Sequence, residues 1–152
     1  MSPAQRQFIV AAQLAAEKAG HPFPLMAGCE AGEESGYGTS ILARSHNNLF
    51  GMKTHAHSIY GTVNLPTREY LKSQWVMVLA KFIHYPDWAS CFADRKATLE
   101  RLSNVYPHYK AAIEAPDSET YIREVSKTWS TDPGRAEHCL AIYQAFQANP
   151  TA

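Results

Sequence analysis

One stretch in the middle of the chain restricts the fold more than any other. Residues 59–85 are rich in Val, Thr, Tyr, Phe and Ile, and the segment QWVMVLAKFIHY contains no residue that typically begins or ends a helix. We therefore predict a β-hairpin, with strands near residues 62–70 and 74–85 that are joined around residues 71–73. Because Pro66 has no backbone N–H, the first strand is expected at an edge or to be irregular. A buried helix over VMVLAKF is the alternative that periodicity alone leaves open.

Helical patterns flank this stretch on both sides. Ser2 and Pro3 are typical of a helix start, and Gly20 ends a first helix that carries an alanine-rich stripe. A second, short helix follows the prolines of residues 22–24 and must stop at the glycines of residues 36–38. Three more patterns predict helices over residues 87–109, over residues 118–129, and from residue 135 towards the terminus. In the first of them, the arginine and lysine side chains are expected on the side opposite an apolar face of Phe92, Leu99, Leu102 and Val105, and Tyr106 and Pro107 are expected to end the helix.

Chain length and hydropathy indicate one domain. The chain has 152 residues, of which 45% are hydrophobic, and this suffices for one core but is small for two domains. We expect residues 1–152 to form a single domain, mainly α with a small β-hairpin (an α+β fold). The hairpin lies between the first and the last helices in the sequence, so that it can project as a flap over a groove between them. Its base must pack on helices, because a lone hairpin is marginally stable.

Charge and hydropathy argue against two classes of partner. Lys plus Arg and Asp plus Glu both number 14, so the formal charge is zero and no large basic surface for nucleic acid is expected. A run of about 18 apolar residues is absent, which predicts no membrane insertion. The first twenty residues contain Gln, Glu and Lys where a secretory signal needs an unbroken apolar run. We expect a chain that is made in the cytoplasm without its own signal peptide.

The cysteines and histidines do not follow the spacing of a metal site. Cys29, Cys91 and Cys139 are widely separated and form no CxxC pair, so that reduced, mostly buried thiols are expected. The histidines within residues 46–57 have no acid at helical spacing and indicate a polar loop. The sequence therefore predicts neither a metal nor a cofactor.

The segment EAGEESGYG, residues 30–38, carries the strongest chemical signal. It places Glu34 in the last turn of a helix that two glycines break. The negative end of the helix dipole and burial would both disfavour ionisation there, and a carboxyl that keeps its proton can protonate a leaving group, as glycoside cleavage requires. Glu30 and Glu34 share one helical face, whereas Glu33 lies about 100° away, so that helical geometry leaves Glu30 and Glu34 as alternatives. A solvated surface acid is the other interpretation of Glu34.

Several blocks of sequence occur together in the order that a known family shows: ESGYG at residues 34–38, then Ser40, Leu42 and Ala43, NNLFGMK at residues 47–53, TREY at residues 67–70, an aromatic strand ending at Phe82 and Tyr85, and WSTDP at residues 129–133. Taken together, these blocks resemble the glucosaminidase family of peptidoglycan hydrolases, also called family 73 glycosidases. The similarity extends from about residue 7 to residue 143, which is nearly the whole chain.

The resemblance implies a lysozyme-like helical lobe with a hairpin flap over a substrate cleft. In that arrangement Glu34 matches the family's proton-donating glutamate, which stands directly before Ser-Gly. Glu69, in the predicted hairpin, matches the second acid that acts as a base or a stabiliser of positive charge. An exposed strand acid is the alternative interpretation of Glu69, because it stands in a variable stretch.

The resemblance also implies a set of substrate-binding residues. Two of them depart from the family pattern, since a tyrosine replaces the usual tryptophan after Ser-Gly, and a tryptophan replaces the later tyrosine. The later tryptophan offers at best a stacking face, and a core role is the alternative. The two asparagines can also cap a helix or form a turn. The expected set is Tyr37, Asn47, Asn48, Phe50 and Trp129.

The function that follows is hydrolysis of the β-1,4 bond after N-acetylglucosamine in peptidoglycan, with Glu34 as general acid. A muramidase, a lytic transglycosylase and a non-catalytic wall-binding module are the alternatives. We expect a monomer whose partner is the glycan strand of peptidoglycan. It would reach the cell wall, in the periplasm or outside the cell, after export or lysis, as a phage endolysin, an effector or a domain of a larger bacteriolytic protein does.

Overall fold

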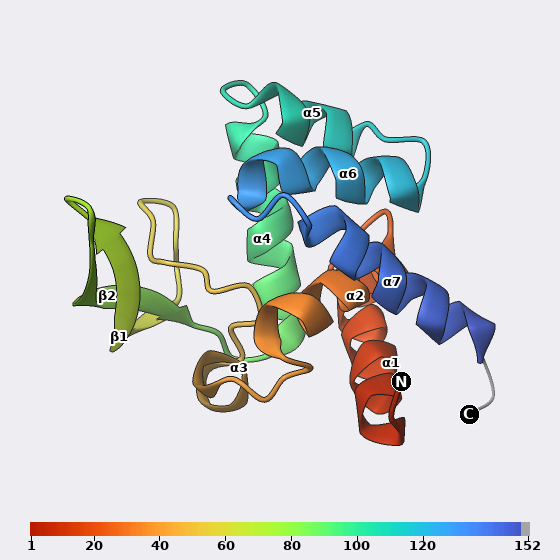
Figure 1. Ribbon diagram of the computed structural model, residues 1–152, viewed down its shortest axis with the longest axis horizontal. Coiled ribbons are helices and arrows are strands. Elements are labelled where there is room, and N and C mark those ends of the chain that lie inside the picture. Colours follow the sequence, from red (N-terminus) through yellow and green to blue (C-terminus); the bar gives the residue numbers. More distant parts are fainter. Residues whose placement is uncertain (150–152) are drawn as a thin grey trace.

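The computed structural model describes residues 1–149 and is mainly α-helical, with one hairpin at its side (Figure 1). Within these residues seven helices and two strands follow each other as α1 (Pro3–Lys18), α2 (Pro24–Ser35), α3 (Ile41–His46), β1 (Gly61–Leu71), β2 (Gln74–His84), α4 (Trp88–Leu102), α5 (Pro107–Ile113), α6 (Ser118–Trp129) and α7 (Arg135–Ala148). The predicted α+β class is confirmed.

The first two helices form a closely packed pair. Ser2 and Gln5 form a capping box at the start of α1, in which each side chain accepts the other's backbone N–H, at 3.1 and 2.9 Å. A Cβ atom at Gly28 of α2 would lie 3.2 Å from backbone atoms of Ile9 and Gln13 in α1. Backbone atoms cannot move aside as a flexible side chain can. The helices α1 and α2 therefore approach each other this closely because residue 28 is a glycine.

The helix α4 packs against α1 and against α5. Figure 1 shows α5 and α6 stacked at one end of the molecule, and α7 lying against both α2 and α6. Buried apolar side chains from α1, α2, α4 and α6 meet in one core. The three cysteines are free and buried, as predicted. No helix within residues 1–149 has the length and apolar character needed to cross a membrane.

The hairpin projects from the helical lobe, at the left of Figure 1. Its strands pair antiparallel from Gly61 opposite His84 to Leu71 opposite Gln74, which confirms the predicted hairpin with ends shifted by about one residue. Lys72 and Ser73 both have positive φ, 49° and 65°, as a two-residue type I′ turn requires.

One face of the hairpin is open to solvent. Burial alternates along both strands. The better covered face includes Glu69, whose carboxylate forms an ion pair with Lys53. The other face exposes Trp75, Met77 and Leu79, whose exposed fractions are 60%, 65% and 76%. Arg68 stacks on the Trp75 ring, with its guanidinium carbon 4.6 Å from the ring centroid. The hairpin thus reverses the usual arrangement, because its larger apolar side chains face water.

The sequence prediction was wrong about the helices near residues 41–46 and 103–113. The predicted helix over residues 87–109 ends at Leu102, and Val105, expected on its apolar face, is 66% exposed. Pro107 begins α5 rather than ending the preceding helix, because proline fits the first turn of a helix without losing a hydrogen bond. The short helix α3 was not predicted, although the Ser40 hydroxyl caps it by accepting the Ala43 N–H.

Candidate active site

Glu34 occupies the last turn of α2, where the segment Ser-Gly-Tyr-Gly ends the helix. Ser35 fixes this end, since its hydroxyl donates to the Ala31 carbonyl at 2.5 Å and accepts the Gly38 N–H at 2.8 Å. Gly36 follows with φ 58° as a left-handed cap. A Cβ atom at Gly38 would lie 2.8 Å from the Phe8 ring, and φ is 79° there. The glycines therefore set the direction in which the chain leaves Glu34.

The carboxyl of Glu34 is held by one buried cation. Arg135 Nε donates to Glu34 Oε1 at 2.8 Å, and the exposed fractions of the two side chains are 2% for Arg135 and 25% for Glu34. The second oxygen, Oε2, has no hydrogen-bond partner among residues 1–149. The expected poorly solvated carboxyl is therefore neither in an apolar pocket nor free in water. One oxygen is anchored, and the other is available.

Glu30 is the competing acid, and its surroundings differ completely. It is fully buried and accepts two hydrogen bonds from Arg95, one from Arg135 at 2.7 Å and one from the Tyr121 hydroxyl. Burial alone would raise its pKa, but the charges of Arg95 and then Arg135 outweigh this effect and hold the pKa of Glu30 well below its usual range. Glu30 stays ionised and inaccessible, so that the structure favours Glu34 over Glu30 as a proton donor.

Two predicted aromatic residues hold the cation beside Glu30. The guanidinium of Arg95 lies over the rings of Phe50 and Trp129, with its central carbon 4.7 and 4.3 Å from the ring centroids. Its Nε has no hydrogen-bond partner within the described chain, and stacking on the two rings partly compensates for this. Phe50 is 4% exposed, whereas Trp129 is half-buried. The core role that the sequence left open for Trp129 is therefore present in the structure.

The two asparagines fix the junction between α3 and the hairpin. Asn48 is 1% exposed, and its side-chain N–H groups donate to the carbonyls of Met52 and Ile83, both at 2.9 Å, while its oxygen accepts the Met52 N–H. Asn47 has φ 52° at the end of α3 and donates to the Tyr85 carbonyl at 3.1 Å. Both amides hold backbone in place, and the structure gives no contact that would test their sugar binding.

The remaining two predicted residues belong to different parts of the chain, since Tyr37 follows α2 and Glu69 lies on β1. Tyr37 follows the end of α2 with φ 55°, and its ring contacts Phe8 edge-on, with centroids 6.1 Å apart. Glu69 lies on β1 and accepts a hydrogen bond from Lys53 Nζ at 2.7 Å, with 30% of its side chain exposed. No ion pair or hydrogen bond within residues 1–149 joins Glu69 to the helical lobe. The structure thus brings Arg135 to Glu34, and it does not bring Glu69 there.

Arg95 and Arg135 are the site residues that the sequence prediction missed. The arginine and lysine side chains of residues 87–109 were expected on the solvent side, yet Arg95 is 1% exposed. Cys91 and Leu99, both buried, lie four residues before and after it. An arginine within such an apolar helical face is the signal that would have indicated a buried ion pair.

A helical lobe with a projecting hairpin, and a partly exposed carboxyl at the end of a helix, are the arrangement expected of a glycosidase of lysozyme-like fold. Residues 10–148 match the Glucosaminidase family, described as mannosyl-glycoprotein endo-beta-N-acetylglucosaminidase. The chain belongs to this family, and the resemblance seen in the sequence is confirmed.

Relatives of known name agree with this membership. The peptidoglycan hydrolase FlgJ of Salmonella typhimurium is 29% identical over 142 residues, which cover 90% of this chain and 43% of FlgJ. The chain thus spans less than half the length of this relative. An autolysin of Enterococcus faecalis is 36% identical over 73 residues, which cover 46% of this chain and 9% of the autolysin.

Solved structures show the same fold. The catalytic domain of the autolysin Auto from Listeria monocytogenes superposes with a TM-score of 0.80 at 21% identity, covering 99% of this chain and 88% of that domain. A C-terminally truncated glycoside hydrolase domain of Salmonella typhimurium FlgJ gives a TM-score of 0.73 at 25% identity. The superposition covers 95% of this chain and 98% of that domain. These likenesses confirm the lysozyme-like architecture that the sequence predicted.

Proposed function

We propose that the chain is an endo-β-N-acetylglucosaminidase that hydrolyses the β-1,4 bond after N-acetylglucosamine in peptidoglycan, with Glu34 as general acid. One observation carries this proposal: the carboxyl of Glu34 is anchored through Oε1 by Arg135 and leaves Oε2 without a partner among residues 1–149. Peptidoglycan is supported as the substrate by the names of the relatives, a peptidoglycan hydrolase and an autolysin.

The anchored carboxyl suits proton donation to a glycosidic oxygen. Oε2 carries the proton and gives it to the oxygen between the two sugars, while the bond from this oxygen to the anomeric carbon breaks. Water then adds to the anomeric carbon and gives a proton to the carboxylate of Glu69 or of Glu34, which leaves a new reducing end. The hydrogen bond from Arg135 Nε stabilises the carboxylate that Glu34 becomes during proton transfer.

Glu69 is the second acid of the proposed mechanism. As a carboxylate it would stabilise positive charge on the sugar ring or accept the proton of the attacking water. Glu69 forms an ion pair with Lys53, whose side chain is 55% exposed. Exposed ion pairs contribute little to the stability of the fold. Exchange of Lys53 for a substrate contact can therefore free Glu69 at small energetic cost. Tyr37, Asn47, Asn48, Phe50 and Trp129 would form or support the cleft walls.

Digestion of purified cell walls tests the proposal. The wild-type protein is expected to create new reducing ends on N-acetylglucosamine, identified by mass spectrometry of the released muropeptides. Glu34→Gln keeps an oxygen that can accept from Arg135 but cannot donate an acidic proton, and it should lose activity by ~10²-fold or more while retaining its melting temperature. Glu33→Gln changes the neighbouring acid, which is 34% exposed, and serves as the matched control.

Other products would contradict the proposal in distinct ways. New reducing ends on muramic acid would identify a muramidase, and anhydromuramic ends would identify a lytic transglycosylase. Muropeptide binding without turnover would indicate a wall-binding module. Full activity of Glu34→Gln would exclude Glu34 as the acid, whichever bond is cut.

We also propose that the protein acts as a monomer at the cell wall. The substrate lies outside the cytoplasm, so that export or cell lysis must precede the reaction. Size-exclusion chromatography with light scattering tests the monomer, for which the chain mass of 16.9 kDa is expected.

A further inference from the structure

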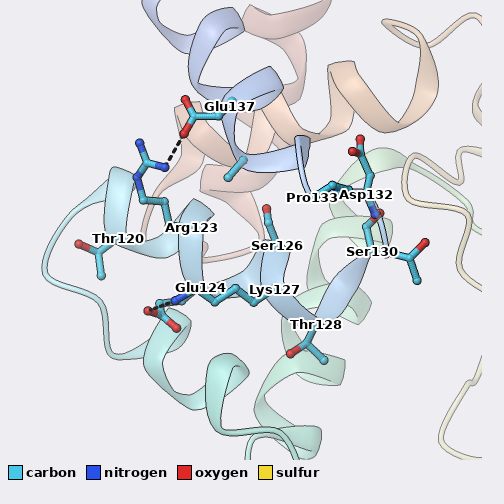
Figure 2. A pocket seen from close by; sticks show the side chains of 12 residues that line it. Thr120, Arg123, Glu124, Ser126, Lys127, Thr128, Ser130, Asp132, Pro133 and Glu137 are labelled. Carbon is cyan, nitrogen blue, oxygen red and sulfur yellow. Dashed lines mark hydrogen bonds and ion pairs between the residues drawn. The ribbon is translucent and has the colours of Figure 1, made fainter.

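A groove of about 940 Å³ lies between α6 and α7, next to the proposed acid (Figure 2). We call it the α6–α7 groove. Hydroxyl and charged side chains dominate its lining, and aromatic side chains are absent from it: Thr120, Arg123, Glu124, Ser126, Lys127, Thr128, Ser130, Thr131, Asp132, Pro133, Ala136 and Glu137. A sugar-stacking site would need an aromatic face, so that this lining suits a ligand rich in amides and charges.

Ser126 provides a buried hydrogen-bond donor in the middle of the groove. It is 7% exposed, and Figure 2 shows its side chain pointing into the space between α6 and the start of α7. Its oxygen accepts from Arg135 NH1 at 2.9 Å, but its own hydroxyl proton has no acceptor among the described residues. Because a buried donor gains by being paired, this hydroxyl favours a ligand that brings a carbonyl or carboxylate oxygen.

The groove and the proposed acid share one side chain. Arg135 donates to Glu34 through Nε and to Ser126 through NH1, so that only the width of a guanidinium and two hydrogen bonds separate the carboxyl from the groove. An extended peptide spans roughly 3.5 Å per residue. Two or three residues therefore suffice to reach from a sugar bound at Glu34 into the groove.

The charges of the groove are held in pairs that a ligand can replace. Arg123 pairs with Glu137 at 2.6 Å and with Glu119 at 3.1 Å. Lys127 pairs with Glu124 at 3.1 Å, and Glu124 also contacts His108. The side chains of Arg123, Glu137 and Lys127 are more than 40% exposed. Exposed ion pairs of this kind contribute about 0–1 kcal/mol to the stability of the fold. Replacing one partner by a charged group of a ligand therefore costs little free energy. Cations and anions lie side by side, which matches a peptide that carries both carboxylate and ammonium groups.

We propose that the α6–α7 groove binds the stem peptide of a muramic acid residue next to the scissile bond, an inference that rests on the proposed function. The Ser126 hydroxyl donates to a peptide carbonyl, Arg123 and Lys127 attract the peptide carboxylates, and the acids opposite them receive an ammonium group. The enzyme would then prefer glycan strands that still carry their peptides.

The experiment compares two substrates: glycan strands with stem peptides, and the same strands after an amidase has removed the peptides. The wild type is expected to cleave the first with a kcat/KM roughly tenfold higher, as one or two charge-assisted hydrogen bonds provide. Lys127→Glu should reduce this ratio severalfold. Lys96→Glu reverses a comparable lysine, paired with Glu100 on α4, and should leave the ratio unchanged.

The outcomes separate this inference from the proposed function. A wild-type ratio near one, or a Lys127→Glu variant with an unchanged ratio, overturns the peptide-binding groove while the glycosidase stands. Absence of cleavage of both substrates by the wild type refutes the proposed function, and the inference falls with it. Lys127 is 52% exposed, so that its reversal is not expected to prevent folding, and an unchanged melting temperature verifies this.

Discussion

Replacing Glu30 by glutamine tests the central packing of the helical lobe. The fully buried carboxylate of Glu30 accepts four hydrogen bonds and neutralises Arg95 and Arg135, which are 1% and 2% exposed. Glutamine has the same shape, but it removes the negative charge and turns an amide N–H₂ group towards arginine donors. Unpairing a buried ion pair costs ~3–5 kcal/mol. For a chain of this size, that corresponds to a decrease in melting temperature of about 10 °C.

Thermal unfolding followed by circular dichroism, at several pH values, measures this effect. The pKa of Glu30 is depressed in the folded protein, so that its contribution is complete above its unfolded value of 4.5 and is lost as the pH falls below that value. The difference in unfolding free energy between wild type and Glu30→Gln should therefore be constant above about pH 5 and narrow in more acidic buffer.

The matched control is Glu33→Gln, on the same helix, with a side chain 34% exposed beside His138. Its free energy of unfolding should change by less than about 0.5 kcal/mol. The control is expected to melt within roughly 2 °C of the wild type. If Glu30→Gln also melts within this range, the buried ion network does not stabilise the lobe.

Three further predictions concern other parts of the molecule. Burial lowers the pKa of His21 from 6.5 to about 4, so that the unfolded chain binds a proton more readily than the folded one. The free energy of unfolding of the wild type should therefore decrease by up to about 3 kcal/mol as the pH falls from 6.5 to 4. The decrease should be smaller for His21→Gln, and melting temperatures at pH 7.5 and 5 measure the difference. Asn48→Ala leaves three buried backbone hydrogen bonds unmade, and urea unfolding should show a loss of about 3 kcal/mol, whereas unchanged stability would contradict its structural role. Replacing Lys72 and Ser73 by Asn-Gly, which accepts positive φ readily, should slow hydrogen exchange of the hairpin amides about fivefold, and faster exchange would exclude the type I′ turn.

The long elements of the fold were predictable because residues near in sequence determine them. Ser2 and Gly20 limit the first helix, and the β-branched and aromatic residues of the middle segment form the hairpin as expected. The helices α3 and α5 were missed because they have six and seven residues, too few for a periodic pattern. The Ser40 hydroxyl caps α3, whereas α5 has no side-chain cap and packs against α4 and α6.

The site was predictable only as far as local sequence describes it. Glu34 stood out because glycines break its helix, whereas its partner Arg135 is 101 residues away and follows Gly134 like any exposed arginine at a helix start. Nothing in the neighbouring residues separates a surface arginine from one that is 2% exposed. Long-range pairing of charges therefore distinguishes Glu30 from Glu34, and the residues next to Arg135 in the sequence do not indicate it.

The buried ion network can be completed only late in synthesis. Glu30 receives its second arginine from α7, 105 residues further along the chain. Domains assemble on the ribosome from the N-terminal side at about 5–20 residues per second, and α7 leaves the exit tunnel only after the other helices. Until then Glu34 lacks its anchoring cation and the α6–α7 groove lacks one wall. The charge partners of Glu30 are thus complete only when the last helix has packed against α2 and α6.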